Sequence, residues 1–251
     1  MLASIRLKTI QLIFNLHDMI NGISRIDWKQ VCSDLDQKGF ARIPNILTES
    51  DCLTLRRHYN DNSLYRNVIN MKRYRFGLGE YKYYSYPLPS VIEELRMATY
   101  SEIAPLANDW MSKLKLSQRY PDQHDKLISL CHDQGQKRPT PLILKYEKGG
   151  FNTLHQDLYG DLFFPFQMVC MLSKPSVEFT GGQFVMVEQI PRAQSRAHVI
   201  ELARGDAMIF TCNYRPVQGI RGFYRCNMKH GVSEVISGER YALGIIYHDA
   251  K

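Results

Sequence analysis

The chain has 251 residues, a length that fits one large domain. Its residues are 44% hydrophobic and 23% charged, with 16 glycines and 11 prolines, which excludes a fibrous or intrinsically disordered protein. No run of about 18 apolar residues is uninterrupted, so we expect no transmembrane segment. The formal net charge of +7 excludes an acidic protein and favours an anionic partner.

The N-terminal part of the chain is helical in pattern. An amphipathic helix is expected at Met1 to Ile23, because polar residues soon interrupt its apolar run and no cleavage site of a secretory signal follows. Residues 38–44 predict a short strand that ends at a proline. Thr48 then caps a further helix, whose apolar face is expected to begin with Leu53 and Leu55.

Residues 56–86 form a basic and aromatic segment. Between residues 56 and 82, seven lysines or arginines stand against two acidic residues, and eight tyrosines or phenylalanines lie between positions 59 and 86. Residues 192–229 hold a second excess of the same size, again seven basic residues against two acidic ones. Cations interleaved with aromatic rings are typical of nucleic-acid binding, while a solvated surface or a lid over another anionic substrate are the alternatives.

After a return to helical periodicity over residues 91–133, the pattern changes at Pro139. Short apolar runs separated by turn signals predict strands at 142–146, 163–172, 183–188, 206–211, 222–228 and 240–247. Many short strands without helices between them predict a sandwich or barrel. We therefore expect an α+β protein of one domain, residues 1–251, with a mainly helical part (1–135) packed on a β-rich core (140–251).

Three residues of the β-rich part have the chemistry of a metal site. His155 and Asp157 are two positions apart, so on a strand their side chains would point to the same face. His230 follows 75 positions later on a separate candidate strand. Two imidazoles and one carboxylate form the facial triad that suits Fe(II) and leaves positions open for other ligands. His155, Asp157 and His230 are therefore the candidate metal-binding and catalytic residues.

Arg240 is a candidate for binding a carboxylate. It lies ten positions after His230, at the start of the last apolar strand, and a guanidinium can hold a carboxylate through two parallel hydrogen bonds. The adjacent pairs His132-Asp133 and His248-Asp249 are weaker alternatives for the metal, because neighbouring residues on a strand point to opposite faces.

Several stretches resemble the Fe(II)/2-oxoglutarate-dependent dioxygenase superfamily, and more narrowly a bacterial family of these oxygenases that is described as acting on damaged nucleic acid. They are Gly77-Leu78-Gly79-Glu80-Tyr81-Lys82-Tyr83, Arg138-Pro139-Thr140-Pro141-Leu142, Leu154-His155-Gln156-Asp157-Leu158-Tyr159-Gly160, Phe179-Thr180-Gly181-Gly182-Gln183-Phe184, Arg215-Pro216-Val217-Gln218-Gly219 and His230-Gly231-Val232-Ser233. The resemblance covers roughly residues 35–250.

This resemblance implies a double-stranded β-helix, of the jelly-roll or cupin type, with Fe(II), 2-oxoglutarate and O2 as cofactor and co-substrates. It implies that His155, Asp157 and His230 bind iron and that Arg240 binds the C5 carboxylate of 2-oxoglutarate. Tyr146 matches a tyrosine that helps to hold the co-substrate in AlkB-type repair oxygenases. The arginine ten positions after the second histidine instead resembles the prolyl hydroxylases, and Leu144 replaces an asparagine of the AlkB type.

The resemblance implies hydroxylation of a C–H bond or oxidative demethylation, and three hypotheses describe the target. The first is a damaged base in nucleic acid, which would make the protein a DNA repair enzyme. The second is a protein side chain or a small metabolite, and the third is a non-catalytic module that keeps the fold. The six cysteines contain no C-x-x-C pair, which favours a reducing, cytoplasmic location. The sequence leaves the oligomeric state open.

Overall fold

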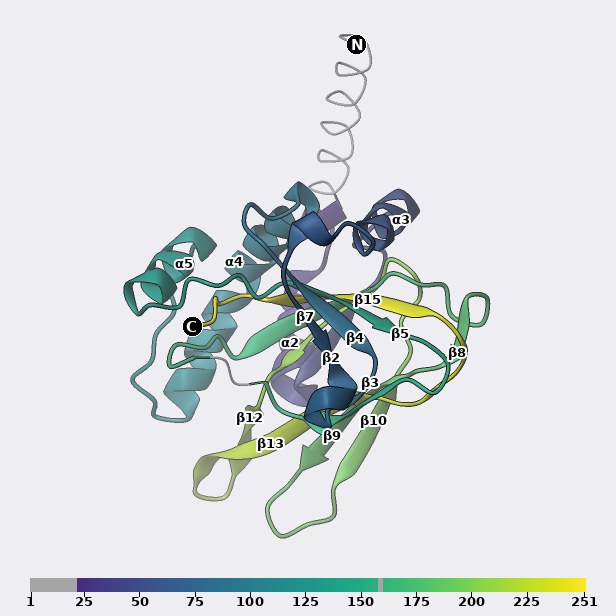
Figure 1. The fold of residues 1–251 in the computed structure, drawn as a ribbon. Coiled ribbons are helices and arrows are strands. Elements are labelled where there is room, and N and C mark those ends of the chain that lie inside the picture. Colours follow the sequence, from purple (N-terminus) through teal and green to yellow (C-terminus); the bar gives the residue numbers. More distant parts are fainter. Residues whose placement is uncertain (1–21, 158–159) are drawn as a thin grey trace.

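The computed structural model describes residues 22–157 and 160–251. The expected helix at the N-terminus therefore lies outside the described residues, apart from its last positions. Two antiparallel sheets face each other, and helices cover the outer face of the larger one (Figure 1). The helices are α2 (Trp28–Lys38), α3 (Glu49–His58), α4 (Ser90–Lys113) and α5 (His124–Asp133), with short 3-10 turns η1 (Asn62–Leu64) and η2 (Met71–Tyr74).

The larger sheet has seven strands. In spatial order they are β1 (Phe40–Ile43), β11 (Ala207–Thr211), β7 (Phe166–Met171), β15 (Arg240–Ile246), β5 (Leu142–Tyr146), β4 (Glu80–Tyr84) and β2 (Tyr65–Asn70). Its central strands are buried on both faces, because one face meets the helices and the other meets the smaller sheet. This double burial explains why these strands are nearly continuous apolar runs in the sequence.

The smaller sheet carries much of the candidate site. Its order is β10 (Arg196–Ile200), β9 (Phe184–Gln189), β13 (Gly222–Val232), β6 (Phe151–His155) and β3 (Gly77–Leu78), with β12 (Tyr214–Gly219) paired to β13. A separate pair joins β8 (Phe179–Gly181) to β14 (Val235–Gly238). Two facing antiparallel sheets in this arrangement are the jelly roll that the resemblance implied.

Side chains alternate between two cores along the strands of the larger sheet. Met168 and Cys170 of β7 join the cluster that packs against helices α2 and α4, whereas Val169 and Met171 point between the sheets. The inter-sheet cluster also contains Phe184 of β9. The helical part is thus packed on one face of the β core, and the space between the sheets stays available for a site.

The structure corrects the expectation for the basic and aromatic segment, residues 56–86, in which no strand was predicted. This segment contains strands β2, β3 and β4; β4 pairs with β5 and β3 pairs with β6, so the segment extends both sheets. Alternating tyrosines favour strands here, but the lysines and arginines among them obscured the pattern. A second correction concerns α3: Thr48 and Asp51 form the expected capping box, but Leu53 is exposed and Cys52 is buried with Leu55 instead.

Candidate active site

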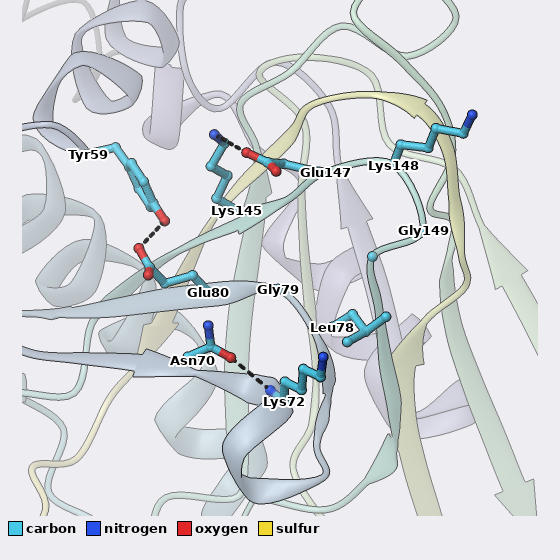
Figure 2. A pocket seen from close by; sticks show the side chains of 11 residues that line it. Tyr59, Asn70, Lys72, Leu78, Gly79, Glu80, Lys145, Glu147, Lys148 and Gly149 are labelled. Atoms are coloured by element: carbon cyan, nitrogen blue, oxygen red, sulfur yellow. Dashed lines mark hydrogen bonds and ion pairs between the residues drawn. The ribbon is translucent and has the colours of Figure 1, made fainter.

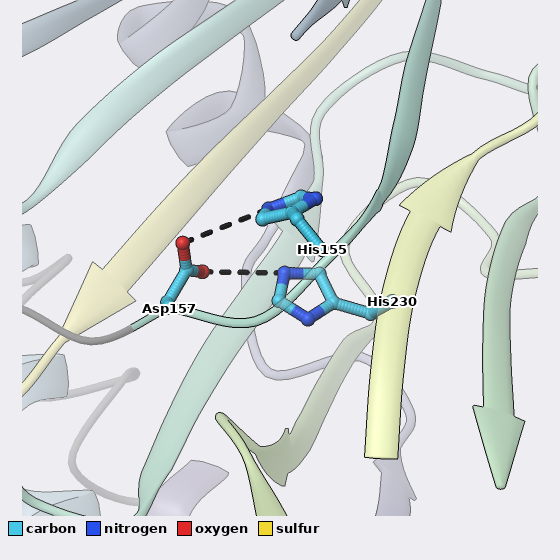
Figure 3. A group of neighbouring side chains, drawn as sticks. All are labelled: His155, Asp157 and His230. Atoms are coloured by element: carbon cyan, nitrogen blue, oxygen red, sulfur yellow. Dashed lines mark ion pairs between the residues drawn. The ribbon is translucent and has the colours of Figure 1, made fainter. Parts of the chain in front are cut away.

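The candidate site lies at the end of β6, beside β13. His155 is the last residue of β6 and pairs directly with His230 of β13. Asp157 lies two residues beyond His155, outside the strand. Its position therefore does not follow from the alternation of side chains along a strand, which was the reason to expect it beside His155. Its backbone N–H instead donates to the carbonyl oxygen of Cys212, which holds the carboxylate near the two imidazoles (Figure 3).

The three side chains meet at one point. His230 Nε2 is 3.2 Å from Asp157 Oδ2, and His155 Nε2 is 3.6 Å from Asp157 Oδ1. One ligand atom from each residue lies within 4.8 Å of those of the other two, which allows a single metal ion to touch all three. The donor set of two imidazoles and one carboxylate fits Fe(II).

The surroundings orient the three candidate ligands. The Thr153 carbonyl oxygen lies 2.7 Å from His155 Nδ1, so Nδ1 carries the proton and Nε2 is left for a metal. The ring of His230 lies nearly parallel to that of Phe184, with 5.8 Å between the centroids, and Phe210 meets it edge-on. Aromatic packing therefore fixes the His230 ring while its Nε2 faces Asp157.

The protonation states of Asp157 and His155 favour metal binding. Burial acts to raise the pKa of Asp157, but a hydrogen bond and the charge of His230, with help from His155, outweigh burial and lower that pKa below its usual range. Burial and then the nearby His230 lower the pKa of His155. A carboxylate that stays ionised and an imidazole that stays neutral are the forms that bind a metal.

Gln167 is a site residue that the sequence interpretation missed. Its amide nitrogen donates to Asp157 Oδ2 at 2.9 Å and lies 3.4 Å from His230 Nε2. It sits in β7, where every residue is buried. The sequence contained one indication of this role: Gln167 is the single amide within an apolar strand. A buried polar side chain needs a hydrogen-bond partner, so an amide at such a position points to a polar site.

Arg240 and Tyr146 lie on neighbouring strands of the larger sheet and face the same cavity. They are direct partners in the pairing of β15 with β5, and the Arg240 guanidinium carbon is 5.4 Å from the centre of the Tyr146 ring. Gly182 leaves room for the arginine, since a Cβ there would come within 2.9 Å of Arg240 Cδ. Burial raises the pKa of Tyr146 to about 12, so its hydroxyl stays protonated.

The Arg240 guanidinium fits a bound carboxylate. It is only 1% exposed, and within residues 22–157 and 160–251 its Nε and Nη2 have no hydrogen-bond partner. A buried guanidinium without an anion is costly, because its lost hydration is not replaced. Two unpartnered donors therefore provide a place for a carboxylate ligand, which agrees with the chemistry of 2-oxoglutarate.

One cavity of about 310 Å3 connects these groups. It is lined by the triad, by Gln167, Tyr146 and Arg240, and by apolar and aromatic side chains that include Phe76, Tyr81, Leu144, Val169, Phe184 and Phe210. The cavity lies between the two sheets, so the elements that build it are far apart in the sequence. Mostly apolar walls with a few convergent polar groups are typical of a small-molecule site.

The alternative histidine pairs have other roles. His132 Nε2 is 3.0 Å from Asp249 Oδ2, and Asp249 also forms a buried ion pair with Arg96. The His248 Nδ1 accepts from the backbone N–H of Phe164. These side chains join the helices to the C-terminal end of the chain, and among the described residues the group suited to a metal is the one at His155.

Solved structures with a similar fold include two prolyl hydroxylases and a non-heme alpha-ketoglutarate-dependent carbocyclase. A prolyl-4-hydroxylase of Pseudomonas putida matches 89% of this chain and 99% of its own, with a TM-score of 0.51 and 14% identity. A prolyl hydroxylase of Trichoplax adhaerens, solved with a hypoxia inducible factor fragment, matches 88% and 89%, with a TM-score of 0.52 and 16% identity. The carbocyclase SnoK of nogalamycin biosynthesis also has a TM-score of 0.52, at 14% identity, over 89% and 84% of the two chains. At these identities the likeness shows the fold, the jelly roll of this class of oxygenases.

The sequence comparisons then give the family. Residues 79–250 match the model of a family described as "Oxygenase, catalysing oxidative methylation of damaged DNA". The uncharacterized protein Rv2227 of Mycobacterium tuberculosis H37Rv is 48% identical over 164 residues, which are 65% of this chain and 70% of the relative. The corresponding protein of strain CDC 1551 matches equally well. The chain belongs to this oxygenase family.

Both the recognition of the family and the jelly-roll fold are thus confirmed. Of the hypotheses on function, the non-catalytic module and the hydroxylase of proteins or metabolites are not favoured. In the described part of the chain, no helix is both long enough and apolar enough to cross a membrane.

Proposed function

We propose that this oxygenase is an Fe(II)- and 2-oxoglutarate-dependent dioxygenase that oxidises damaged bases in nucleic acid, with His155, Asp157 and His230 as the iron ligands and Arg240 as the residue that binds the C5 carboxylate of 2-oxoglutarate. The observation that carries the proposal is the buried Arg240 side chain in the same cavity as the triad, whose Nε and Nη2 have no hydrogen-bond partner among the described residues. Bound there, Fe(II) would supply the chemistry of oxidative decarboxylation, in which 2-oxoglutarate and O2 give succinate and CO2, with one oxygen atom of O2 entering succinate and the other hydroxylating a substrate C–H bond.

The protein's own residues position and shield this chemistry. Gln167 holds one carboxylate oxygen of Asp157, and the Tyr146 ring packs beside the guanidinium. Phe184 and Phe210 contact each other and the His230 ring, and both line the cavity, so apolar surface covers this part of the site. A dry cavity with fixed groups limits unproductive reactions at the site.

Damaged nucleic acid is the substrate that the family description and the surface support. For a methylated base, hydroxylation of the methyl carbon followed by release of formaldehyde would restore the original base, which is an oxidative demethylation. The β9–β10 and β12–β13 hairpins, which project at the lower end of the molecule (Figure 1), carry exposed cations that form no ion pair with any described residue: Arg192, Arg196, Arg221 and Arg225. Such cations can bind phosphates.

A cytoplasmic location belongs to the same proposal. All six cysteines lie in the described part of the chain and carry free thiols, and five of them are buried. Free thiols are typical of a reducing compartment.

The test is succinate release coupled to a substrate. The purified protein with Fe(II), 2-oxoglutarate and O2 is assayed against alkylated oligonucleotides, their unmodified counterparts, peptides and small metabolites. The proposal predicts succinate and formaldehyde that rise with alkylated oligonucleotides, and loss of both in the variant His230→Ala. Stimulation by peptides or metabolites alone would contradict the nucleic-acid substrate and leave the reaction class in place.

A further inference from the structure

Two exposed aromatic rings stand at the mouth of the cavity. Tyr74 ends the turn η2 and Phe76 precedes β3, and their rings are stacked, with centroids 5.5 Å apart and planes within 17°. Phe76 also lines the cavity that holds the triad. The two residues are 55% and 46% exposed, although large aromatic side chains in a monomer usually have protein around them.

The backbone, not the rings, holds this segment in place. The Phe76 carbonyl oxygen accepts hydrogen bonds from both the backbone N–H and the hydroxyl of Thr153, each at 2.9 Å. Gly77 has a φ of +140°, and a Cβ there would lie 2.2 Å from the Phe151 carbonyl oxygen. The rings of Tyr74 and Phe76 are therefore not needed to set the shape of the segment, and their outer faces remain available.

The free positive charge of the first basic segment is concentrated around these rings. Within the described residues, Lys72, Arg73 and Arg75 are exposed and take part in no ion pair, and no acidic residue occurs between positions 71 and 78. Of the other cations of the segment, Arg57 on α3 is also exposed and donates to the Thr54 hydroxyl at 2.8 Å, and three are engaged by other parts of the protein.

Three of those engaged cations show the contrast. Arg56 pairs with Glu178 at 2.8 Å, Arg66 donates to the Pro139 carbonyl oxygen, and Lys82 is buried with its ammonium group on the Tyr59 carbonyl oxygen. Their charges stabilise the fold, so the group of neighbouring cations left for a ligand is the one beside Tyr74 and Phe76.

A second cavity lies on the other side of the segment. It has a volume of about 420 Å3, and Lys72, Leu78 and Lys148 are among its lining residues (Figure 2). Lys148, in the turn between β5 and β6, is exposed and also takes part in no ion pair among the described residues. Gly79 also lines this cavity, and a Cβ there would lie 2.8 Å from the ring of Tyr146, which lines the first cavity. Lys72 and Lys148 thus extend the cations from the aromatic pair to the second cavity, which also has Glu80 and Glu147 in its lining.

We propose that Tyr74 and Phe76 form a stacking platform for an unpaired base of single-stranded nucleic acid, next to the base that enters the cavity, with Lys72, Arg73 and Arg75 on the adjoining phosphates. The inference rests on the proposed function and adds that the nucleic-acid substrate is single-stranded. A base in a duplex has both faces covered by its neighbours, so an exposed protein ring stacks only on an unpaired or extruded base. The platform therefore selects single strands over duplexes.

The test measures binding without turnover. The protein is loaded with Fe(II) and 2-oxoglutarate under anaerobic conditions, and fluorescence anisotropy gives the Kd for a labelled 16-nucleotide single strand and for its duplex. We expect tighter binding of the single strand, and a Kd about tenfold weaker for Tyr74→Ala and for Phe76→Ala. Tyr74→Phe and Phe76→Tyr keep a ring and should stay within about twofold of the wild type.

Matched controls separate stacking from general effects. Leu53→Ala removes an equally exposed apolar side chain from α3 and should leave the Kd unchanged. Lys72→Gln, Arg73→Gln and Arg75→Gln should each reduce the slope of log K against log salt by about 0.7, whereas Lys126→Gln on α5 should not. Far-UV circular dichroism and thermal unfolding check that each variant is folded.

The outcomes distinguish this inference from the proposed function. Wild-type affinity in both alanine variants, or tighter binding of the duplex, would overturn the platform even if alkylated oligonucleotides still stimulate succinate release. A wild-type protein that neither binds nor oxidises oligonucleotides but acts on a peptide would overturn both. Weaker binding in the alanine variants, rescued by the aromatic replacements, supports the platform.

Discussion

At the scale of single residues, the site depends on polar side chains that neighbouring groups of the protein hold in place. The His155, Asp157 and His230 side chains are held by a backbone carbonyl, by an amide and by two phenylalanines. The sequence was enough to predict that the three residues and Arg240 belong together, because their chemistry is distinctive. It could not identify Gln167 or Phe210, whose roles arise only when strands far apart in the sequence pack together.

Gln167 should control the affinity for metal. Replacing it with methionine keeps the volume but removes the hydrogen bond to Asp157, so the carboxylate is less well oriented. We expect Fe(II) to bind about 10- to 100-fold more weakly to Gln167→Met, as is typical when a group that orients a metal ligand is lost. Anaerobic titration calorimetry measures the affinity for Fe(II). The control is Gln218→Met, which makes the same replacement at an exposed residue. Unchanged affinity in Gln167→Met would show that Asp157 is oriented without it.

The buried His124 side chain should make the stability of the fold depend on pH. Burial, and then the charge of Arg96, lower its pKa from 6.5 to about 4, and its Nε2 lies 2.8 Å from the Tyr247 carbonyl oxygen. In the folded protein the His124 imidazole is neutral. Between pH 6.5 and pH 4, the unfolded chain therefore binds more protons than the folded protein. The free energy of unfolding should therefore fall as the pH falls through this range, by at most about 1.4 kcal/mol per pH unit from this residue.

Urea unfolding at a series of pH values checks this dependence. The variant His124→Gln can still donate to the carbonyl oxygen but does not titrate, so its curve should be flatter between pH 6.5 and pH 4. Equal slopes for His124→Gln and wild type would assign the dependence to other groups.

At the scale of elements, the segment from β2 to β4 departs most from the sequence-based expectation. Its strands connect the two sheets, since β4 extends the larger sheet and β3 extends the smaller one at the edge of the cavity. Long-range pairing with β5 and β6 decides this outcome, and local sequence patterns carry little information about such pairing. The strands β7, β11 and β15 of the larger sheet were predicted from the sequence because buried strands have nearly continuous apolar runs.

Gly77 should be required for this arrangement. In Gly77→Ala, the new Cβ would meet the Phe151 carbonyl oxygen at 2.2 Å, and an L side chain rarely adopts the φ of +140°. We expect the free energy of unfolding to fall by about 1–3 kcal/mol. Gly149→Ala is the matched control, because Gly149 also has a positive φ but has open space around it. Denaturant midpoints compare the two variants, and a smaller loss at Gly77 than at Gly149 would refute this explanation.

At the scale of the whole molecule, a buried polar network joins the helices to the β core. The Arg96 guanidinium of α4 donates to Asp249 at 2.8 Å and to the Ile246 carbonyl oxygen, and both Arg96 and Asp249 are fully buried. Tyr86 and His132 bind the same carboxylate. We propose on this basis that the helical part and the β core form a single domain that unfolds as one unit.

Breaking this network should destabilise the whole chain. Asp249→Ala leaves the Arg96 guanidinium buried without its charge partner, and we expect a loss of about 3–5 kcal/mol in the free energy of unfolding. Far-UV and near-UV circular dichroism, followed together during unfolding, should give coincident transitions in wild type and variant. The exposed change Asp133→Ala on α5 is the control. Separate transitions for helices and sheets would instead indicate two domains.

The central claim is that one ferrous ion and one 2-oxoglutarate molecule occupy the cavity between the sheets, and anaerobic absorption spectroscopy tests it most directly. Titration of Fe(II) and 2-oxoglutarate into the wild-type protein should produce a visible metal-to-ligand charge-transfer band. The band should be absent in Asp157→Ala, and in Arg240→Gln it should need about 10- to 100-fold more 2-oxoglutarate, since a charged hydrogen-bond donor is lost. A wild-type protein without this band, or an Asp157→Ala variant that retains it, would contradict the account.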